Sequence, residues 1–510
     1  MYSIERNDIL KTILLINPDS YDGRISPPLG LGLIASYIKT KNHYNVKIID
    51  LNIHSNSYLQ HYISNNKNNI IFIGISALSM TFLDVINVIN TIKYSYPQLK
   101  IVLGGVYPSF EYNEILNNYK CIDYVLVGEG EQSVYELAKA LENKFEISKV
   151  KGLAWRNISN NIPILNSLPD TKAAEYNNIP IDYSFFDNDA YTKKNFGIKT
   201  LYLLTSRGCP FNCSFCSNST YSKNFCSGFR YRPIKVVTDE LREYKKFYDK
   251  INQIMIYDND FLINVKRSSE IINIIKKYYG NVKIKFLTRA DSFIKAQDFL
   301  KECIKLNELE IEVGIESFSN SQLIRYNKKI TLLDIEKILN FVTRNKINID
   351  IDLLIFDPFV TNDELLETLN KIVEYGLCEK LEYALFLRCY LYSGTEMTKK
   401  AIVENIATGS SFCDVWQFKD VLINEIWSFL QLYKNTLYEK VKELRNTLSE
   451  KIANCNNSML KSQLIFQRYR TYEIAFKFAI DLCNSKNIAC FKNIYEKYYI
   501  LVQDLFDKFI

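Results

Sequence analysis

Histidine is scarce in this sequence: only three of its 510 residues are histidines, and none follows His61. Long apolar runs are absent as well, because none reaches the roughly 18 to 20 residues that a helix needs to span a bilayer. The N-terminal segment, MYSIERNDILKTILLINP, has charges among its apolar residues and lacks the continuous apolar stretch of a signal peptide. We therefore expect a cytoplasmic protein that makes no contact with a membrane.

Glycine, proline and net charge are low too. The chain has 17 Gly and 11 Pro, which excludes a collagen-like or a low-complexity protein. Its net charge is +6, and no run of Lys and Arg is long enough to follow a phosphate backbone, so nucleic acid is an unlikely partner. With 47% hydrophobic and 24% charged residues the composition is globular, and 510 residues indicate two or three domains.

Residues 1–150 alternate short β-branched runs with helical patterns, which indicates a doubly wound parallel sheet of the Rossmann type. Turn residues follow the expected strands, on the side where open α/β sheets bind ligands. Those singled out as candidate ligand contacts are Ser76, Gly104, Gly105, Tyr107, Gly128 and Glu129. Residues 151–195 are polar and rich in Pro and Asn, and we expect a small hairpin and a linker there.

A second βα series begins near residue 196. Its expected strands cover residues 200–205, 253–260, 283–291, 308–317, 347–356 and 382–391. Six such units predict a partial (β/α)6 barrel, ending near residue 400, with its site at the carboxyl ends of the strands. From 401 to 510 the pattern is helical, and seven apolar residues from Ile426 to Leu448 form one stripe. We expect this last segment to cap the barrel.

The twelve cysteines contain one cluster, within TSRGCPFNCSFCSNST (205–220). Cys209, Cys213 and Cys216 form a C-x3-C-x2-C pattern on a loop that leaves a strand. A zinc site would need a fourth, distant ligand, whereas an iron-sulfur cluster held by three thiolates keeps one iron open for another ligand. The remaining alternative is a chance group of buried cysteines.

This triplet, with Phe215 before its third cysteine, resembles the cluster loop of the radical S-adenosylmethionine (SAM) enzymes. That resemblance implies a 4Fe-4S cluster whose open iron binds the methionyl part of SAM. It also implies reductive cleavage of SAM to a 5′-deoxyadenosyl radical that abstracts a hydrogen atom, chemistry that belongs to the cofactor while the barrel positions it. An electron donor such as flavodoxin or ferredoxin is the expected partner.

Further stretches carry the same resemblance through the barrel: IYDNDFLIN (256–264), FLTRAD (286–291), EVGIES (312–317) and LYSGTEM (391–397). Bound SAM needs hydrogen-bond acceptors for its ribose and amine and a cation for its carboxylate. The candidates are Asp258, Asp260, Arg289, Glu316 and Arg230. The first four have the alternative role of salt bridges at the barrel rim, and Arg230 and Arg232 that of solvated charges at a helix start. Asp357 stands where relatives more often have glycine, which puts the subfamily in doubt.

The first domain resembles the cobalamin-binding domain that precedes the barrel in cobalamin-dependent radical SAM enzymes, through GISALS, GGVYPSF and VLVGEGEQSVYELAKAL. Glycine turns let the backbone approach a large flat ligand. The D-x-H-x-x-G signature, whose histidine ligates cobalt, is absent: Asp50 and His54 have a different spacing. The alternative is a domain that has lost cobalamin and only covers the barrel.

Together the two resemblances imply a methyltransferase that acts on an unactivated carbon, or on phosphorus, of a small-molecule or peptide precursor. A radical enzyme of the same architecture that performs a rearrangement, an oxidation or a C-C bond formation is the first alternative. A non-catalytic metal- or cobalamin-binding sensor is the second. No residue is assigned a catalytic role from the sequence.

Overall fold

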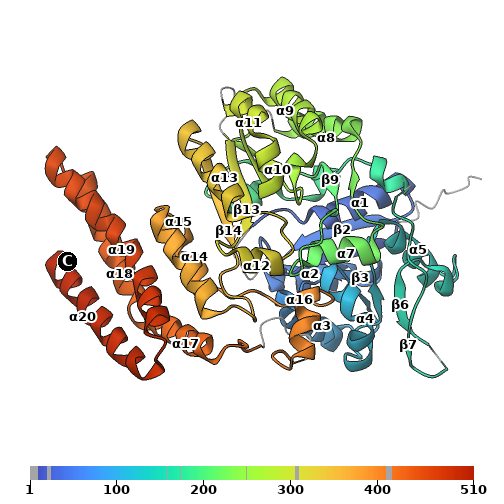
Figure 1. Ribbon diagram of the computed structural model, residues 1–510. Helices are drawn as coiled ribbons and strands as arrows, with labels where there is room; N and C mark the ends of the chain where they lie inside the picture. The colour runs from blue at the N-terminus through green and yellow to red at the C-terminus, as the bar shows by residue number, and fades with distance from the viewer. Residues whose placement is uncertain are drawn as a thin grey trace, which may run out of the picture.

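The structure is a computed structural model that describes residues 10–19, 25–157, 159–172, 174–248, 250–304, 309–408 and 416–509. It contains two large sheets flanked by helices, a small two-stranded sheet and a C-terminal group of helices, and this confirms the predicted α/β architecture (Figure 1). Within these residues no helix combines the length and the apolar character that crossing a membrane requires.

The N-terminal sheet has the strand order β2-β1-β3-β4-β5-β6-β7. Strands β1 to β5 are parallel, and the β6–β7 hairpin continues the sheet in antiparallel fashion. The expected hairpin therefore exists, and it extends this sheet. The strands are β1 (Thr12–Asn17), β2 (Asn45–Asp50), β3 (Ile70–Ser76), β4 (Lys100–Gly104), β5 (Tyr124–Leu126), β6 (Leu153–Arg156) and β7 (Pro163–Leu165).

Both faces of this sheet are buried, because successive side chains of a strand point to opposite sides. Ile13 and Leu15 of β1 belong to the core under α1 (Leu29–Lys41) and α5 (Glu131–Leu141). Leu14 and Ile16 belong to a second core on the other face. That core lies under α2 (Asn56–Asn66), α3 (Phe82–Ser95) and α4 (Val106–Asn118). The α1–α5 side is continuous with the core of the second sheet, so it joins the two domains.

The second sheet is fully parallel, with the order β14-β13-β12-β11-β8. Its strands are β8 (Thr200–Leu203), β11 (Gln253–Ile256), β12 (Lys283–Arg289), β13 (Leu309–Glu316) and β14 (Asn348–Leu353). The first half of the expected sixth strand, 382–391, is a 3-10 helix (Glu382–Phe386), and the second half meets the sheet through one parallel bridge, Phe356 to Arg388. The prediction of a sixth full strand is therefore wrong.

Helices cover the outer side of the second sheet. They include α8 (Ile234–Phe247), α9 (Val265–Tyr279), α10 (Ala290–Lys295), α11 (Gln297–Ile304), α13 (Leu332–Asn345), α14 (Asn362–Glu374) and α15 (Cys378–Leu381). Shorter helices follow the strands' carboxyl ends or precede the sheet: α6 (Asn188–Lys194), α7 (Ser217–Phe225), α12 (Asn320–Arg325) and α16 (Glu396–Val403). The linker clamps the two domains together: Tyr183 donates to the carbonyl of Tyr202, and the Asp182 amide donates to Ser36.

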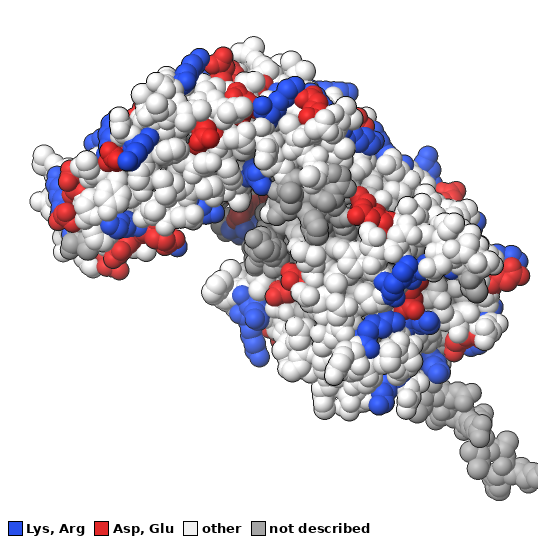
Figure 2. Space-filling model, turned by 90° about the horizontal axis from the view of Figure 1, so that it is seen from below, with Lys and Arg blue, Asp and Glu red and all other residues white. Residues whose placement is uncertain are grey.

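The C-terminal unit consists of α17 (Val421–Thr436), α18 (Tyr438–Ala453), α19 (Ser458–Ser485) and α20 (Phe491–Phe509). The predicted apolar stripe is buried, but it is divided between α17 and α18, which meet at Leu437. The unit packs beside the barrel against α14 and α15, and Figure 2 shows it projecting from the body, with charges of both signs interspersed on that face. Its role as a cap remains a prediction.

A buried ion pair fastens this unit to the barrel. Arg445 of α18 donates to both carboxylate oxygens of Glu382, one of them at 2.5 Å, and its guanidinium lies 4.0 Å from the ring centre of Tyr472. We expect Arg445→Met to lower the free energy of unfolding by about 3 to 5 kcal/mol, because it leaves a buried carboxylate alone. Hydrogen exchange should show the loss in α17–α20. The double variant Arg445→Met/Glu382→Gln should regain most of it, and equal losses in both variants would contradict this assignment.

Candidate functional site

The cysteine loop leaves the carboxyl end of β8 and enters α7 at Ser217. Its first residues form β9 (Ser206–Arg207), which pairs with β10 (Arg230–Tyr231). At Gly208 the backbone has φ +76°, and an added Cβ would lie 2.7 Å from the carbonyl oxygen of Gly228. Only glycine fits this position, because L-residues resist positive φ and the neighbouring atom is rigid backbone. The turn that presents Cys209 therefore depends on Gly208.

The middle of the loop is anchored to the segment that follows β13. The Ser214 amide donates to the carbonyl of Tyr326 at 3.1 Å, and the Ser214 hydroxyl donates to the carbonyl of Arg325 at 2.7 Å. The ring of Phe215 packs edge-on against Tyr326. The Met397 amide donates to the Ser214 carbonyl, so α16 holds the loop from the other side. The aromatic residue before the third cysteine thus has a packing role.

Besides burial, the thiols of Cys213 and Cys216 raise the pKa of Cys209, and the thiol of Cys213 also raises the pKa of Cys216. Within the described residues no three His, Cys, Asp or Glu side chains form a group that could hold a single metal ion. This spacing does not fit one zinc ion, which needs its ligands about 2.3 Å from the metal. Burial raises the pKa of Cys209 to about 11 and also raises that of Cys216.

Arg289, at the end of β12, lies against this group of thiols. Its guanidinium donates to Cys213 Sγ at 3.1 Å and to the carbonyl of Lys328 at 2.7 Å, and it pairs with Asp291 at 2.8 Å. The ring of Phe211 lies 3.9 Å below the guanidinium. The guanidinium therefore provides a cation beside the cysteines for the carboxylate of a ligand.

Asp258 and Asp260, the two predicted acceptors after β11, have partners inside the protein. Asp258 is 4% exposed and accepts hydrogen bonds from the amides and hydroxyls of Thr205 and Ser206, among them 2.6 Å from the Thr205 amide. Asp260 accepts from Thr288 and Ser292 at 2.7 and 2.6 Å. Burial raises the pKa of both carboxyls despite these donors. Neither joins an ion pair among the described residues; their carboxylates bind the segments that follow β8 and β12, and their contact with SAM remains a prediction.

Glu316 ends β13 in a strained backbone conformation, with φ +72°. Its carboxylate pairs with the buried Lys328 at 3.0 Å. An added Cβ at Gly314 would lie 2.9 Å from Glu316 Oε1 and 3.2 Å from Lys328 Nζ, so glycine makes room for the pair. Non-glycine residues with positive φ concentrate at functional sites. The salt-bridge alternative applies to Glu316 and Arg289, and their contact with SAM remains a prediction.

Asp357, the departure from the family pattern, is fully buried and accepts hydrogen bonds from Gln322, Tyr326 and Arg325, the last at 2.8 Å. Arg325 also pairs with Glu364 at 2.8 Å. The carbonyls of Arg325 and Tyr326 accept hydrogen bonds from Ser214 of the cysteine loop. Asp357 holds the side chains of the same two residues, so it supports the loop indirectly. A glycine at this position would offer no such carboxylate.

A cavity of about 510 Å³ lies between the carboxyl edge of the first sheet and the start of the cysteine loop. Its wall from the first domain includes five predicted residues: Ser76, Gly104, Gly105, Gly128 and Glu129. The sixth predicted residue, Tyr107 of α4, is buried against Phe82 of α3 and is not part of the cavity wall. The barrel contributes residues that the sequence analysis did not single out: Leu204, Ser206, Arg207, Gly208, Asn218, Tyr221, Tyr257 and Asn259.

An ion network closes the interface beside this cavity. Glu129 pairs with Arg230 and accepts a hydrogen bond from Tyr176, and Glu131 pairs with Arg207 at 2.6 Å. Arg230 is outside the cavity lining, and Arg232 is fully buried against Glu240. The alternative of solvated charges is therefore wrong for both Arg230 and Arg232. Contact of Arg230 with SAM remains a prediction. Within the protein its guanidinium already pairs with the carboxylate of Glu129.

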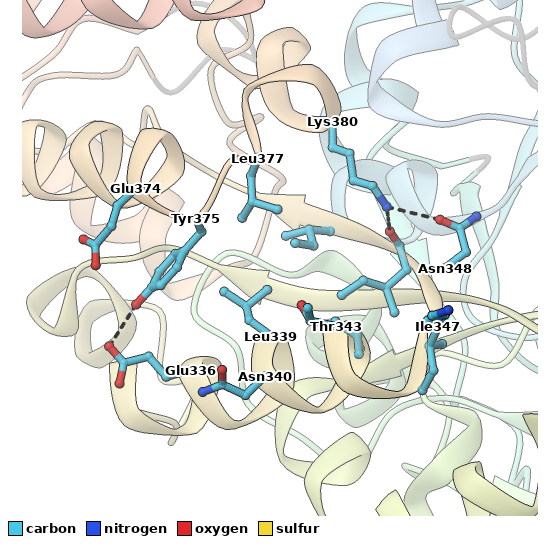
Figure 3. A pocket seen from close by; sticks show the side chains of 14 residues that line it. Glu336, Leu339, Asn340, Thr343, Ile347, Asn348, Glu374, Tyr375, Leu377 and Lys380 are labelled. Atoms are coloured by element: carbon cyan, nitrogen blue, oxygen red, sulfur yellow. Dashed lines mark hydrogen bonds between the residues drawn. The ribbon is translucent and has the colours of Figure 1, made fainter. Parts of the chain in front are cut away.

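A second cavity, about 630 Å³, lies between α13, α15 and the start of β14 (Figure 3). Lys380 donates to Asn348 and to the carbonyl of Ile349 across it, and Tyr375 donates to Glu336. No predicted site residue lines it. It lies at the amino end of β14, whereas the cysteine loop follows the carboxyl end of β8, so it is separate from the site.

The first cavity fits a large flat ligand such as cobalamin. An added Cβ at Gly30 or Gly104, both in its wall, would meet no atom within 4 Å and would project into open space. Two nitrogens of Arg207, Nε and Nη2, are buried without a hydrogen-bond partner among the described residues, and Arg207 is part of the same wall. The three cysteines likewise fit a cluster that is larger than one ion.

Comparisons with known proteins agree with this geometry. Residues 203–372 match the Radical SAM superfamily and residues 22–138 match the B12 binding domain. An uncharacterized methyltransferase of Pyrococcus horikoshii is 28% identical over 78% of this chain and 84% of its own length. The anaerobic magnesium-protoporphyrin IX monomethyl ester cyclase of Rubrivivax gelatinosus is 23% identical, over 70% of this chain and 64% of its own length.

Among solved structures, the cobalamin-dependent S-adenosylmethionine radical enzyme OxsB, with aqua-cobalamin and S-adenosylmethionine bound, superposes with a TM-score of 0.76 at 17% identity. The match covers 98% of this chain and 80% of OxsB. The radical S-adenosylmethionine methyltransferase TsrM of Kitasatospora setae gives 0.57 at 14% identity, over 72% and 70% of the two chains. A cobalamin-binding domain followed by a radical SAM domain, with the cysteine triplet at the start of its barrel, places this chain among the cobalamin-dependent radical SAM enzymes, whose cofactors are a 4Fe-4S cluster, SAM and cobalamin.

Proposed function

We propose that this enzyme methylates an unactivated carbon, or a phosphorus, of a small-molecule or peptide precursor. The observation that carries the proposal is the cavity that the glycine turns of the cobalamin domain share with Arg207 and Gly208, directly before Cys209. It brings the cobalamin side of the molecule to the cluster loop, as transfer of a methyl group to a substrate radical requires. When bound, the cluster and SAM supply a 5′-deoxyadenosyl radical and methylcobalamin supplies the methyl group.

The chain's own residues position these groups. Cys209, Cys213 and Cys216 would hold the cluster, and Arg289 donates a hydrogen bond to Cys213 Sγ. The buried ion pair of Glu316 and Lys328 fixes the end of β13 at the same edge of the sheet. Hydrogen bonds from the Ser214 amide to Tyr326 and from the Met397 amide to Ser214 hold the loop in place, with Cys209 buried and Cys213 and Cys216 half-buried.

Curated relatives support methyl transfer without being unanimous. They include the hopanoid C-3 methylase of Methylococcus capsulatus and the cytidylyl-2-hydroxyethylphosphonate methyltransferase of Streptomyces wedmorensis. They also include the cyclase and the 4′-phospho-dehydrooxetanocin synthase of Priestia megaterium. The second candidate function, favoured by these last names, is a radical reaction without methyl transfer in the same architecture. The reductant under either function is a flavodoxin or ferredoxin.

The experiment that separates the two functions uses SAM with a deuterated methyl group. Full-length enzyme, purified without oxygen and loaded with cluster and cobalamin, is mixed with a reductant and with libraries of small molecules and peptides. Methyl transfer predicts both S-adenosylhomocysteine and 5′-deoxyadenosine, and a product that carries the label. Substrate-dependent 5′-deoxyadenosine without S-adenosylhomocysteine would contradict methylation and support the second function. Cobalamin-free enzyme is the control, and it should give no labelled product.

A further inference from the structure

Arg207 has hydrogen-bonding capacity that the protein does not use. Its side chain is 8% exposed and lines the cavity between the domains. Nη1 donates to Glu131 at 2.6 Å, whereas the N-H groups at Nε and Nη2 have no partner among the described residues. Buried donors without partners are rare, because each one costs about 1 to 3 kcal/mol. A ligand in this cavity is therefore the natural acceptor for them.

The charge around Arg207 limits what that acceptor is. Nη1 of Arg207 lies 2.6 Å from a carboxylate oxygen of Glu131 and 3.5 Å from one of Glu129. Arg230 also pairs with Glu129. Two arginines and two glutamates balance each other. Burial alone would lower the pKa of Arg207, but the two carboxylates raise it above its ordinary value, so the group stays charged. Donors within a neutral network suit a neutral carbonyl better than another anion, which would meet both glutamates.

Cobalamin presents such carbonyls, because its corrin ring carries neutral amide side chains, whereas its nucleotide tail carries a phosphate. We propose that Arg207 is a cobalamin-binding residue of the barrel and donates Nε-H and Nη2-H to amide oxygens of the corrin. Arg207 lies two residues before Cys209, on β9, so a corrin held there would be fixed to the strand that leads into the cluster loop. The inference depends on cobalamin as the ligand and is independent of whether a methyl group is transferred.

The test measures affinity in place of turnover. Full-length protein with a reconstituted cluster and no cobalamin is titrated without oxygen with hydroxocobalamin, followed by absorbance. Arg207→Lys keeps the charge opposite Glu131 but loses the forked donors, and we expect its Kd to rise about ten- to one-hundred-fold. Arg230→Lys is the matched control: it disturbs the same network from outside the cavity lining and should change Kd less than threefold.

Three further measurements test the proposal: iron content, melting temperature and titration with cobinamide. Iron content and the melting temperature without cobalamin should match the wild type in both variants, which excludes a folding defect as the cause. Titration with cobinamide, which keeps the corrin amides and lacks the nucleotide tail, should show the same penalty for Arg207→Lys. An unchanged Kd, an equal loss in both variants, or a penalty that disappears with cobinamide would each overturn the proposal.

Discussion

Replacing Cys209, Cys213 or Cys216 with alanine should abolish both the cluster and the cleavage of SAM. Each thiolate is one of the three predicted cluster ligands, and no other cysteine of the described residues lies in this loop. We expect iron and sulfide to fall to near zero and 5′-deoxyadenosine formation to drop below detection. Cobalamin binding should persist, because none of the three cysteines lines the cavity.

Cys226 supplies the matched control for these variants. It is buried, and its carbonyl accepts a hydrogen bond from Thr171. Because Cys226 follows α7, whereas the triplet precedes that helix, it lies outside the cysteine loop. Cys226→Ala should keep its iron, at a stability cost of about 1 kcal/mol for the lost packing. Full iron content in any of the three triplet variants, or loss of the cluster in Cys226→Ala, would contradict the assignment.

Asp258→Ala should have the second-largest effect, because it removes the support of the cysteine loop. The carboxylate accepts four hydrogen bonds from Thr205 and Ser206, where β8 turns into the cysteine loop. Alanine would leave two buried amides without acceptors, and we expect a loss of at least about 3 kcal/mol in the free energy of unfolding. Thermal melting of the apoprotein and iron per chain after reconstitution measure this effect, and both should fall.

Asp258→Asn separates support of the loop from contact with SAM. Asparagine keeps one acceptor oxygen, and the hydroxyls of Thr205 and Ser206 can rotate to accept from its amide, so melting temperature and iron content should stay close to the wild type. Affinity for SAM should also be unchanged. If Asp258→Asn kept its iron but lost SAM binding, Asp258 would be a ligand of SAM and its structural role would be secondary.

The sequence predicted the elements whose signal is local. Continuous apolar strands such as Ile13–Ile16 are buried on both faces, and their pattern shows this without any partner. Residues 382–391 have the composition of a strand, yet Glu382 pairs with Arg445 of α18 and residues 382–386 form a 3-10 helix. That contact joins residues 63 positions apart, and no local pattern reports it.

The candidate site shows the same division. The spacing of the three cysteines is a local signal, and Gly104 and Gly128 follow strands as expected, so these were accessible from the sequence. The partners of Asp258 and of Arg230 were not, because each carboxylate or guanidinium meets groups from other elements. Arg207 was accessible from the sequence as well, because it stands two residues before Cys209, next to the cysteine pattern.

The most direct test of the account is to measure cobalamin, iron and sulfide per chain. The protein would be produced in cells supplied with cobalamin and purified without oxygen, with cobalamin identified by absorbance and mass spectrometry. The account predicts close to one cobalamin, about four irons and about four sulfides per chain. Four irons without cobalamin would contradict it, because the cavity between the two domains would then have another purpose and methyl transfer would lose its donor.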